Sequence, residues 1–124
     1  MTIAKAISKV DALKPNTYTT EEKIDWLSTL DARVKSQIID AHECNEPIFF
    51  YGYDSLSNQE TKLLVPAPYD DIYLRWLEAH IDYANGEYGK YNNSITAYND
   101  AYEIYQRYYN RTYMPISKGT KFKF

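Results

Sequence analysis

The sequence predicts a mainly α-helical domain of four helices, with a long helical hairpin and a small β-hairpin or extended loop between helices 2 and 3. Between Leu74 and Tyr109, apolar residues recur at alternating steps of three and four, which is the spacing of one helix face. Thr19 and Glu22 form a capping-box pattern ahead of another apolar run. The segment 45–68, by contrast, is interrupted by proline and glycine.

The first two helices are expected over residues 3–13 and 20–43. Thr2 is the predicted N-cap of the first, and Pro15 follows its end. The predicted buried face of the second carries Ile24, Leu27, Leu30, Val34, Ile38 and Ala41. Asp31 and Lys35 are expected to form an i,i+4 ion pair on the solvent side of this helix.

The segment 45–68 contains two short β-favouring runs, Ile48–Tyr51 and Lys62–Val65, separated by polar residues. A small hairpin fits this pattern, and so does an extended loop held by its aromatic residues. Because long loops in compact domains often have a function, we expect this one to contact a partner. Its candidate docking residues are Phe49, Phe50, Tyr51 and Tyr53.

The third and fourth helices are expected over residues 70–85 and 87–110. Asp70 and Asp71 are predicted to cap the third helix, because carboxylates complement the positive end of a helix. Asn85-Gly86 is a common helix stop. Gly86 and Gly89 would each cost about 1 kcal/mol inside a helix. We therefore favour an antiparallel hairpin of two helices, with one long kinked helix as the alternative.

Tyrosine fills most of the apolar face of the fourth predicted helix. It offers a large contact area, but a buried hydroxyl needs a hydrogen-bond partner, so a tyrosine-rich face suits a partly hydrated subunit interface. The alternative is an ordinary core whose hydroxyls reach the solvent at its rim. The candidate interface residues are Tyr88, Tyr91, Tyr98, Tyr102, Tyr105 and Tyr109.

Charge divides the chain into a single acidic domain, residues 1–117, and a basic tail, residues 118–124. The domain holds eleven Lys and Arg against seventeen Asp and Glu, a net charge of −6, whereas the tail has three lysines and no acid. An acidic domain argues against nucleic acid as the main partner. The alternation Lys121-Phe122-Lys123-Phe124 is typical of a strand and suggests a docking arm, with a free tail as the alternative.

The single cysteine, Cys44, favours a reducing compartment, because it cannot form an internal disulfide. The N-terminal residues lack the apolar core of a signal peptide, so none is expected. No apolar run is long enough to span a bilayer, and no membrane partner is expected.

No residue pattern predicts catalysis, a metal site or a cofactor. His42, Glu43 and Cys44 are consecutive and would point in different directions from a helix. Glu78 and Asp82 are expected on a solvated face, and no phosphate-binding, nucleophile-elbow or zinc-protease motif is present. The chain is therefore not expected to be an enzyme.

Several stretches of the chain share one resemblance, and the most specific of them is Leu63-Leu64-Val65-Pro66-Ala67-Pro68-Tyr69-Asp70-Asp71-Ile72-Tyr73. The others are Val10–Asn16, Glu22–Leu27, Tyr91–Ser94 and Asn110–Pro115. Together they resemble small proteins encoded in the structural gene blocks of tailed phages and prophages of Gram-positive bacteria. The likeness covers most of residues 10–115, carries no catalytic residues, and does not include the tail after Pro115.

Members of that group are thought to be head–tail connector, or adaptor, proteins. The resemblance implies an adaptor-type helical domain that forms an oligomeric ring below the portal and continues the DNA channel. It also implies that the partners are other copies of the chain, the portal and tail-side proteins, with DNA passing through non-specifically. The expected location is the virion, and the bacterial host cytoplasm during assembly. The alternative function is a soluble module that binds a peptide or a single strand with its tyrosine-rich face.

Overall fold

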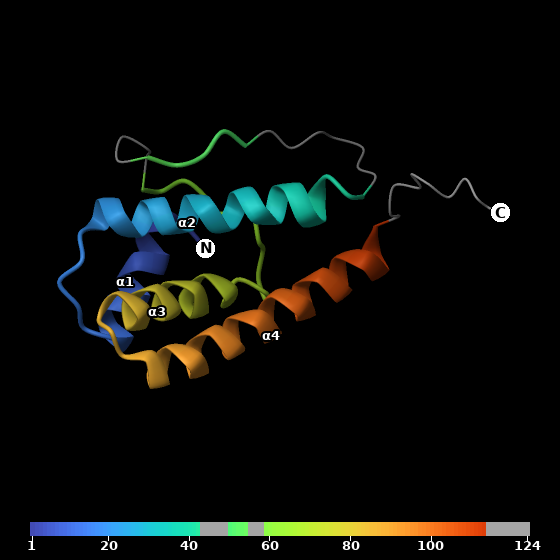
Figure 1. Ribbon diagram of the computed structural model, residues 1–124. Coiled ribbons are helices and arrows are strands. Elements are labelled where there is room, and N and C mark those ends of the chain that lie inside the picture. The colour runs from blue at the N-terminus through green and yellow to red at the C-terminus, as the bar shows by residue number, and fades with distance from the viewer. Residues whose placement is uncertain (43–49, 55–58, 114–124) are drawn as a thin grey trace.

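The computed structural model describes residues 1–42, 50–54 and 59–113 of the chain, and Figure 1 shows its helices. The helices are α1 (Ile3–Leu13), α2 (Thr20–Val34), α3 (Ile72–Ala84) and α4 (Tyr88–Thr112), and a π-helical turn, η1 (Lys35–Ile39), continues α2. The predicted all-helical class is confirmed. Residues 50–54 and 59–71 contain no β-strand, so the described part of the long connection is an extended loop.

The helix boundaries follow the local signals in the sequence. The Thr2 side chain accepts a hydrogen bond from the Lys5 amide, and Thr19 and Glu22 form the complete capping box. Between α3 and α4, Gly86 adopts φ +76°, which favours glycine, so the chain turns there and two separate helices form.

The second helix ends earlier than expected. A π-helical turn follows Val34, and the Asp40 amide donates to the Lys35 carbonyl at 2.9 Å. The π-helix ends at Ile39 and Asp40 and Ala41 form a turn, so Ala41, which was expected on the buried face, is exposed. Glu43, the expected last residue, lies outside the described residues.

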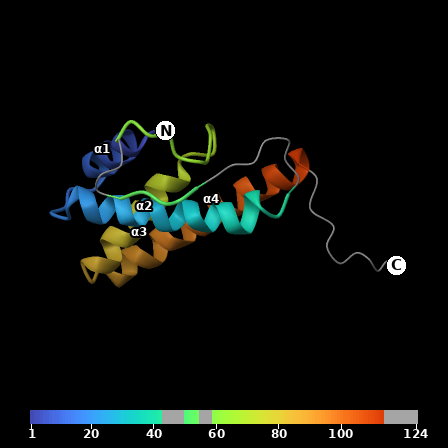
Figure 2. The same ribbon diagram turned by 90° about the horizontal axis from the view of Figure 1, so that it is seen from above.

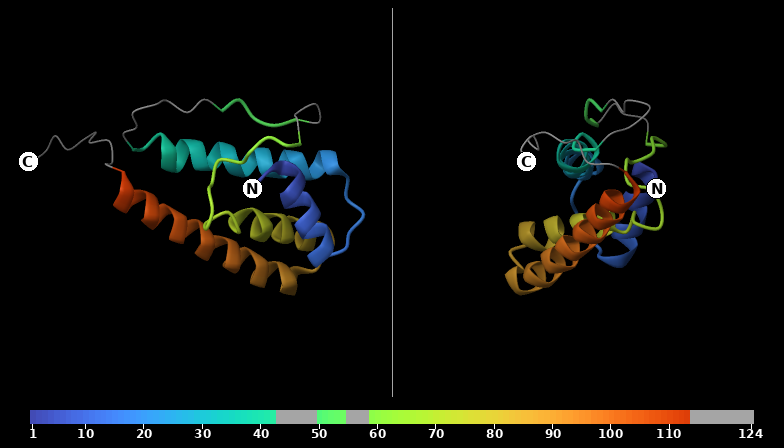
Figure 3. Two further views of the ribbon diagram at one scale, coloured as in Figure 1. Left: turned by 180° about the vertical axis from the view of Figure 1, so that it is seen from behind. Right: turned by 90° about the vertical axis from the view of Figure 1, so that its right-hand side faces the viewer.

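The four helices enclose one apolar core. α3 and α4 pack against each other, α2 packs on α3, and α1 packs on both α2 and α3 (Figure 2). α4 runs antiparallel to α3 and extends well beyond the start of α3, as Figure 3 shows from behind. The fully buried side chains include Ile3, Val10, Leu27, Leu30, Ile72, Leu77 and Ile81.

The segment before α3 is fastened to the N-terminus by backbone hydrogen bonds. Ile3 donates to the Thr61 carbonyl at 3.1 Å, and Ala4 donates to the Gln59 carbonyl at 2.9 Å. Leu63 donates in turn to the Met1 carbonyl at 2.9 Å. Free amides at the start of α1 are therefore satisfied by the loop.

Asp31 lies at the centre of the fold, fully buried. Its two carboxylate oxygens accept hydrogen bonds from the Tyr53 hydroxyl at 2.5 Å, the Tyr73 hydroxyl at 2.6 Å and the Leu64 amide at 3.1 Å. The Tyr73 hydroxyl also accepts from the Val65 amide at 2.7 Å. Burial raises the pKa of Asp31, although these hydrogen bonds oppose the shift. The expected solvent-side pair with Lys35 is thus wrong.

Two further acidic residues differ from expectation. Asp82 was predicted on a solvated face, but it is buried and accepts from Lys14 Nζ at 2.7 Å and from the Ser94 hydroxyl at 2.6 Å. Asp71 forms no side-chain cap on α3, because its backbone is already helical. Asp70 instead lies 3.6 Å from the Met1 amino group.

Replacing Asp31 with alanine is expected to lower the free energy of unfolding by about 3–5 kcal/mol, because two buried hydroxyls and an amide lose their acceptor. Asp25→Ala, on the exposed side of the same helix, is the matched control and should change it by less than about 0.5 kcal/mol. Urea denaturation of both variants measures the difference. Equal effects would show that the Asp31 cluster does not stabilise the fold.

Candidate functional site

The tyrosine face of α4 divides between the core and the surface. Tyr98, Tyr105 and Tyr109 are buried within the chain itself. These three residues therefore belong to the core of the chain, as the alternative interpretation had it. Their predicted role in a subunit interface is wrong, because the chain itself already covers their surface. Tyr91 and Tyr102 are half-buried, and Tyr88 is 60 % exposed.

A row of side-chain hydrogen bonds connects α4 to the α2–η1 region. Arg33 Nη1 donates to the Tyr98 hydroxyl at 3.3 Å, and the Tyr102 hydroxyl donates to Gln37 Oε1 at 2.6 Å. Farther along, the ring of His42 hydrogen-bonds the Asn110 side chain at 2.7 Å and the Ile38 carbonyl at 2.6 Å. Long side chains thus bridge α4 and the segment that runs from the end of α2 to His42.

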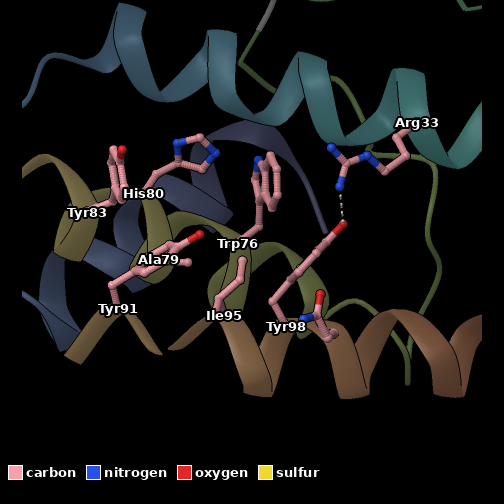
Figure 4. Close-up of a pocket in the computed structure, with 9 residues that line it drawn as sticks. Arg33, Trp76, Ala79, His80, Tyr83, Tyr91, Ile95 and Tyr98 are labelled. Atoms are coloured by element: carbon pink, nitrogen blue, oxygen red, sulfur yellow. Dashed lines mark hydrogen bonds between the residues drawn. The ribbon is translucent and has the colours of Figure 1, made fainter. Parts of the chain in front are cut away.

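A cavity of about 370 Å³ lies beside the first of these bridges. Its walls come from α2, α3 and α4, and Figure 4 shows Arg33 reaching towards Tyr98 from above. The lining residues are Arg33, Trp76, Ala79, His80, Tyr83, Tyr91, Ile95, Tyr98 and Asn99. Its size falls within the usual range of ligand pockets.

Aromatic rings fix the α3 wall of this cavity. His80 stacks on Trp26 with 4.9 Å between ring centroids and meets the edge of Trp76 at 4.4 Å. The Trp76 indole donates to the Trp26 carbonyl at 2.6 Å. Arg33 places its guanidinium carbon 5.2 Å from the Trp76 ring centroid, a cation–π contact.

Burial, and then the positive charge of Arg33, lower the pKa of His80 from 6.5 to about 4. His80 is therefore neutral at neutral pH and contributes a flat, uncharged ring to the cavity. Burial also raises the pKa of Tyr102 to about 12, so its hydroxyl remains a neutral donor.

The predicted docking loop is only partly described. Tyr51 is 92 % exposed, whereas Tyr53 uses its hydroxyl on Asp31 and packs against Phe50 at 4.9 Å. Tyr53 therefore has a structural role, and its role in docking stays a prediction. Phe49 and the tail residues Lys121, Phe122, Lys123 and Phe124 lie outside the described residues.

Sequence reasoning missed the cavity. Trp76 and His80 are four residues apart on α3, and this aromatic pairing was a usable signal. No sequence signal joins Arg33 to them, because the contact depends on the packing of α2 against α3.

Comparison of the chain with protein-family models, with curated proteins and with solved structures gave no match. In the part of the chain that the structure describes, no group of three or more His, Cys, Asp or Glu residues is placed to hold a metal ion. None of the described helices is long and apolar enough to cross a membrane.

Tyr105→Ala is expected to lower the free energy of unfolding by about 3–5 kcal/mol, because it removes a ring that is almost fully buried. Tyr88→Ala, on the exposed part of the same helix, should change it by less than about 0.5 kcal/mol. Chemical denaturation compares the two. Losses of equal size would contradict the division of the tyrosine face into core and surface.

Acidification is expected to destabilise the protein through His80. The unfolded chain takes up a proton near pH 6.5 and the folded protein only near pH 4, so the free energy of unfolding falls as pH decreases through this window. Because the ring is partly exposed, we expect a loss of about 1–2 kcal/mol, less than the full shift implies.

His80→Phe keeps a stacking ring but removes the titration. Urea denaturation at about pH 7 and about pH 4.5 should show a smaller acid loss in this variant than in the wild type. The other titrating groups are the same in both proteins, so their contribution cancels. An identical pH dependence of the two proteins would contradict the role of His80 in the loss of stability at low pH.

Proposed function

We propose that this chain is a structural virion component, a head–tail connector that acts by assembling into a ring between portal and tail, without catalysis. One observation carries the proposal. The stretch with the most specific resemblance to the connector group, Leu63 to Tyr73, builds the centre of the fold. Leu63, Val65, Ile72 and Tyr73 are buried, and Leu64 donates its amide to Asp31. The resemblance to the connector group therefore falls on residues of the buried core, which supports a shared fold.

Surface features are compatible with assembly. Apolar and aromatic side chains remain open to solvent at Tyr51, Tyr83, Tyr88 and Ile104, each more than half exposed. Such side chains become hot spots when a partner buries them. The net charge of −6 over residues 1–117 would repel the phosphates of DNA, which suits a channel through which DNA slides without binding.

The aromatic cavity favours a second function, a soluble module that grips a peptide or a single strand. Stacking of bases on Tyr83 or Tyr91, in the cavity that holds the Arg33 cation, would follow the usual chemistry of single-strand binding. Affinity for single-stranded DNA that falls steeply with salt would favour this function over the connector. Absence of binding to single-stranded DNA at low salt would exclude single-strand binding as the function of this module.

The connector proposal predicts that the protein forms rings on the portal protein encoded in the same structural gene block. Electron microscopy of the chain alone and with that portal tests it. We also expect Tyr51→Ala to weaken portal binding by about 2 kcal/mol without changing thermal stability, because Tyr51 is almost fully exposed.

Lys9→Ala, on the exposed side of α1, is the matched control and should bind the portal as the wild type does. A protein that stays monomeric and ignores the portal would overturn the connector proposal. Normal binding by Tyr51→Ala would exclude only the loop as the docking element.

A further inference from the structure

Arg33 is a partly buried cation whose charge is not neutralised within the described structure. It contacts the face of Trp76 and the hydroxyl of Tyr98, and no carboxylate of residues 1–42, 50–54 and 59–113 forms an ion pair with it. A cation withdrawn from water gains more from an incoming carboxylate than an exposed one does. The cavity of about 370 Å³ at its side gives a carboxylate room to approach.

The remaining lining residues narrow the chemistry of the occupant. Tyr83, Tyr91 and Ile95 offer accessible apolar surface, and His80 is neutral at neutral pH. Arg33 is therefore the lining residue that carries a positive charge. An occupant that combines a carboxylate with a neighbouring aliphatic group matches both the charge and the walls.

The outward surface of α4 presents this combination. Ile104 is 53 % exposed and lies in a shallow depression with Asp100, Glu103 and Arg107. Glu103 is paired with Arg107, whereas no basic group of the described residues forms an ion pair with Asp100. Asp100 and Ile104 are four residues apart, so their side chains are neighbours on one face of the helix.

This acidic–aliphatic patch and the cavity lie on different sides of α4. Ile104 follows Tyr98 by six residues, which turns it about 240° around the helix axis from a residue that lines the cavity. One molecule cannot fill its own cavity with this patch, but a second copy can. Since the two surfaces differ, repeated contacts run head to tail, and such contacts close into rings when the rotation permits.

We propose that Asp100 and Ile104 of one copy bind in the Arg33 cavity of the next, with Asp100 pairing with Arg33 and Ile104 covering Ile95. This inference rests on the proposed connector function and identifies the surfaces that would join neighbouring subunits. The partner is a second copy of this chain.

Two variants that each disable one surface test the proposal. Arg33→Glu reverses the charge of the cavity and leaves the patch intact, whereas Ile104→Lys disables the patch and leaves the cavity intact. Circular dichroism first confirms that both are folded. Ile104→Lys is labelled with ¹⁵N, and the NMR chemical shifts of its amides and indoles are followed at protein concentrations up to about 1 mM. At this concentration, association with a dissociation constant in the millimolar range is detected.

Each variant alone should self-associate at least tenfold more weakly than the wild type, as measured by the concentration dependence of its chemical shifts. Mixing the two should restore binding, because one functional cavity then meets one functional patch, and the product should stop at a 1:1 dimer. The shifts should include the Trp76 indole of the labelled variant. Lys90→Glu, on an exposed side of α4 near its start, is the control and should associate as the wild type does.

A mixture that remains monomeric while the wild type self-associates would overturn the proposal, and so would a wild type without shifts at about 1 mM. Binding of the Arg33 cavity to the portal, and not to another copy, would also overturn it. In each case rings on the portal seen by electron microscopy would leave the connector function standing. A wild-type protein that does not bind the portal would refute the connector function separately.

Discussion

The buried carboxylate of Asp31 is the constraint on which the arrangement of the fold depends. A carboxylate without water is costly unless its oxygens are bonded, and here the donors come from three separate parts of the chain. Tyr53 belongs to the loop, Leu64 to the segment before α3, and Tyr73 to the first turn of α3. All three must be in place together for Asp31 to be satisfied. The cluster therefore selects one position for an extended segment whose backbone is otherwise held by its pairing with the N-terminus.

Periodicity and capping signals were enough to predict the four helices and most of their ends. The start of α2 followed from the capping box, and the break before α4 from Asn85-Gly86. These signals act between residues close in sequence, so they can be interpreted without tertiary contacts. The π-helical turn after Val34 had no comparable local signal, and the predicted end of that helix was wrong accordingly.

Charged residues were predicted less well, because their partners are distant in sequence. Asp31 lies four residues after Leu27 and three before Val34, both fully buried, so it was already on the apolar face. An i,i+4 pairing with Lys35 gave a simpler explanation and was wrong. Asp82 pairs with Lys14, 68 residues away, and Arg33 meets Trp76 only through helix packing. Neither contact could be derived without the fold, which is why the cavity was missed.

The tyrosines of α4 explain how that cavity persists. Tyr98 and Tyr102 reach Arg33 and Gln37 through their hydroxyls, across a distance that a leucine side chain would not span. A leucine face would draw α4 closer to α2 and fill the space between them. Tyrosine instead holds the helices apart and satisfies its polar end, leaving an aromatic hollow beside a cation. A site held open in this way loses little entropy when an occupant enters, which favours binding by a small surface on a partner.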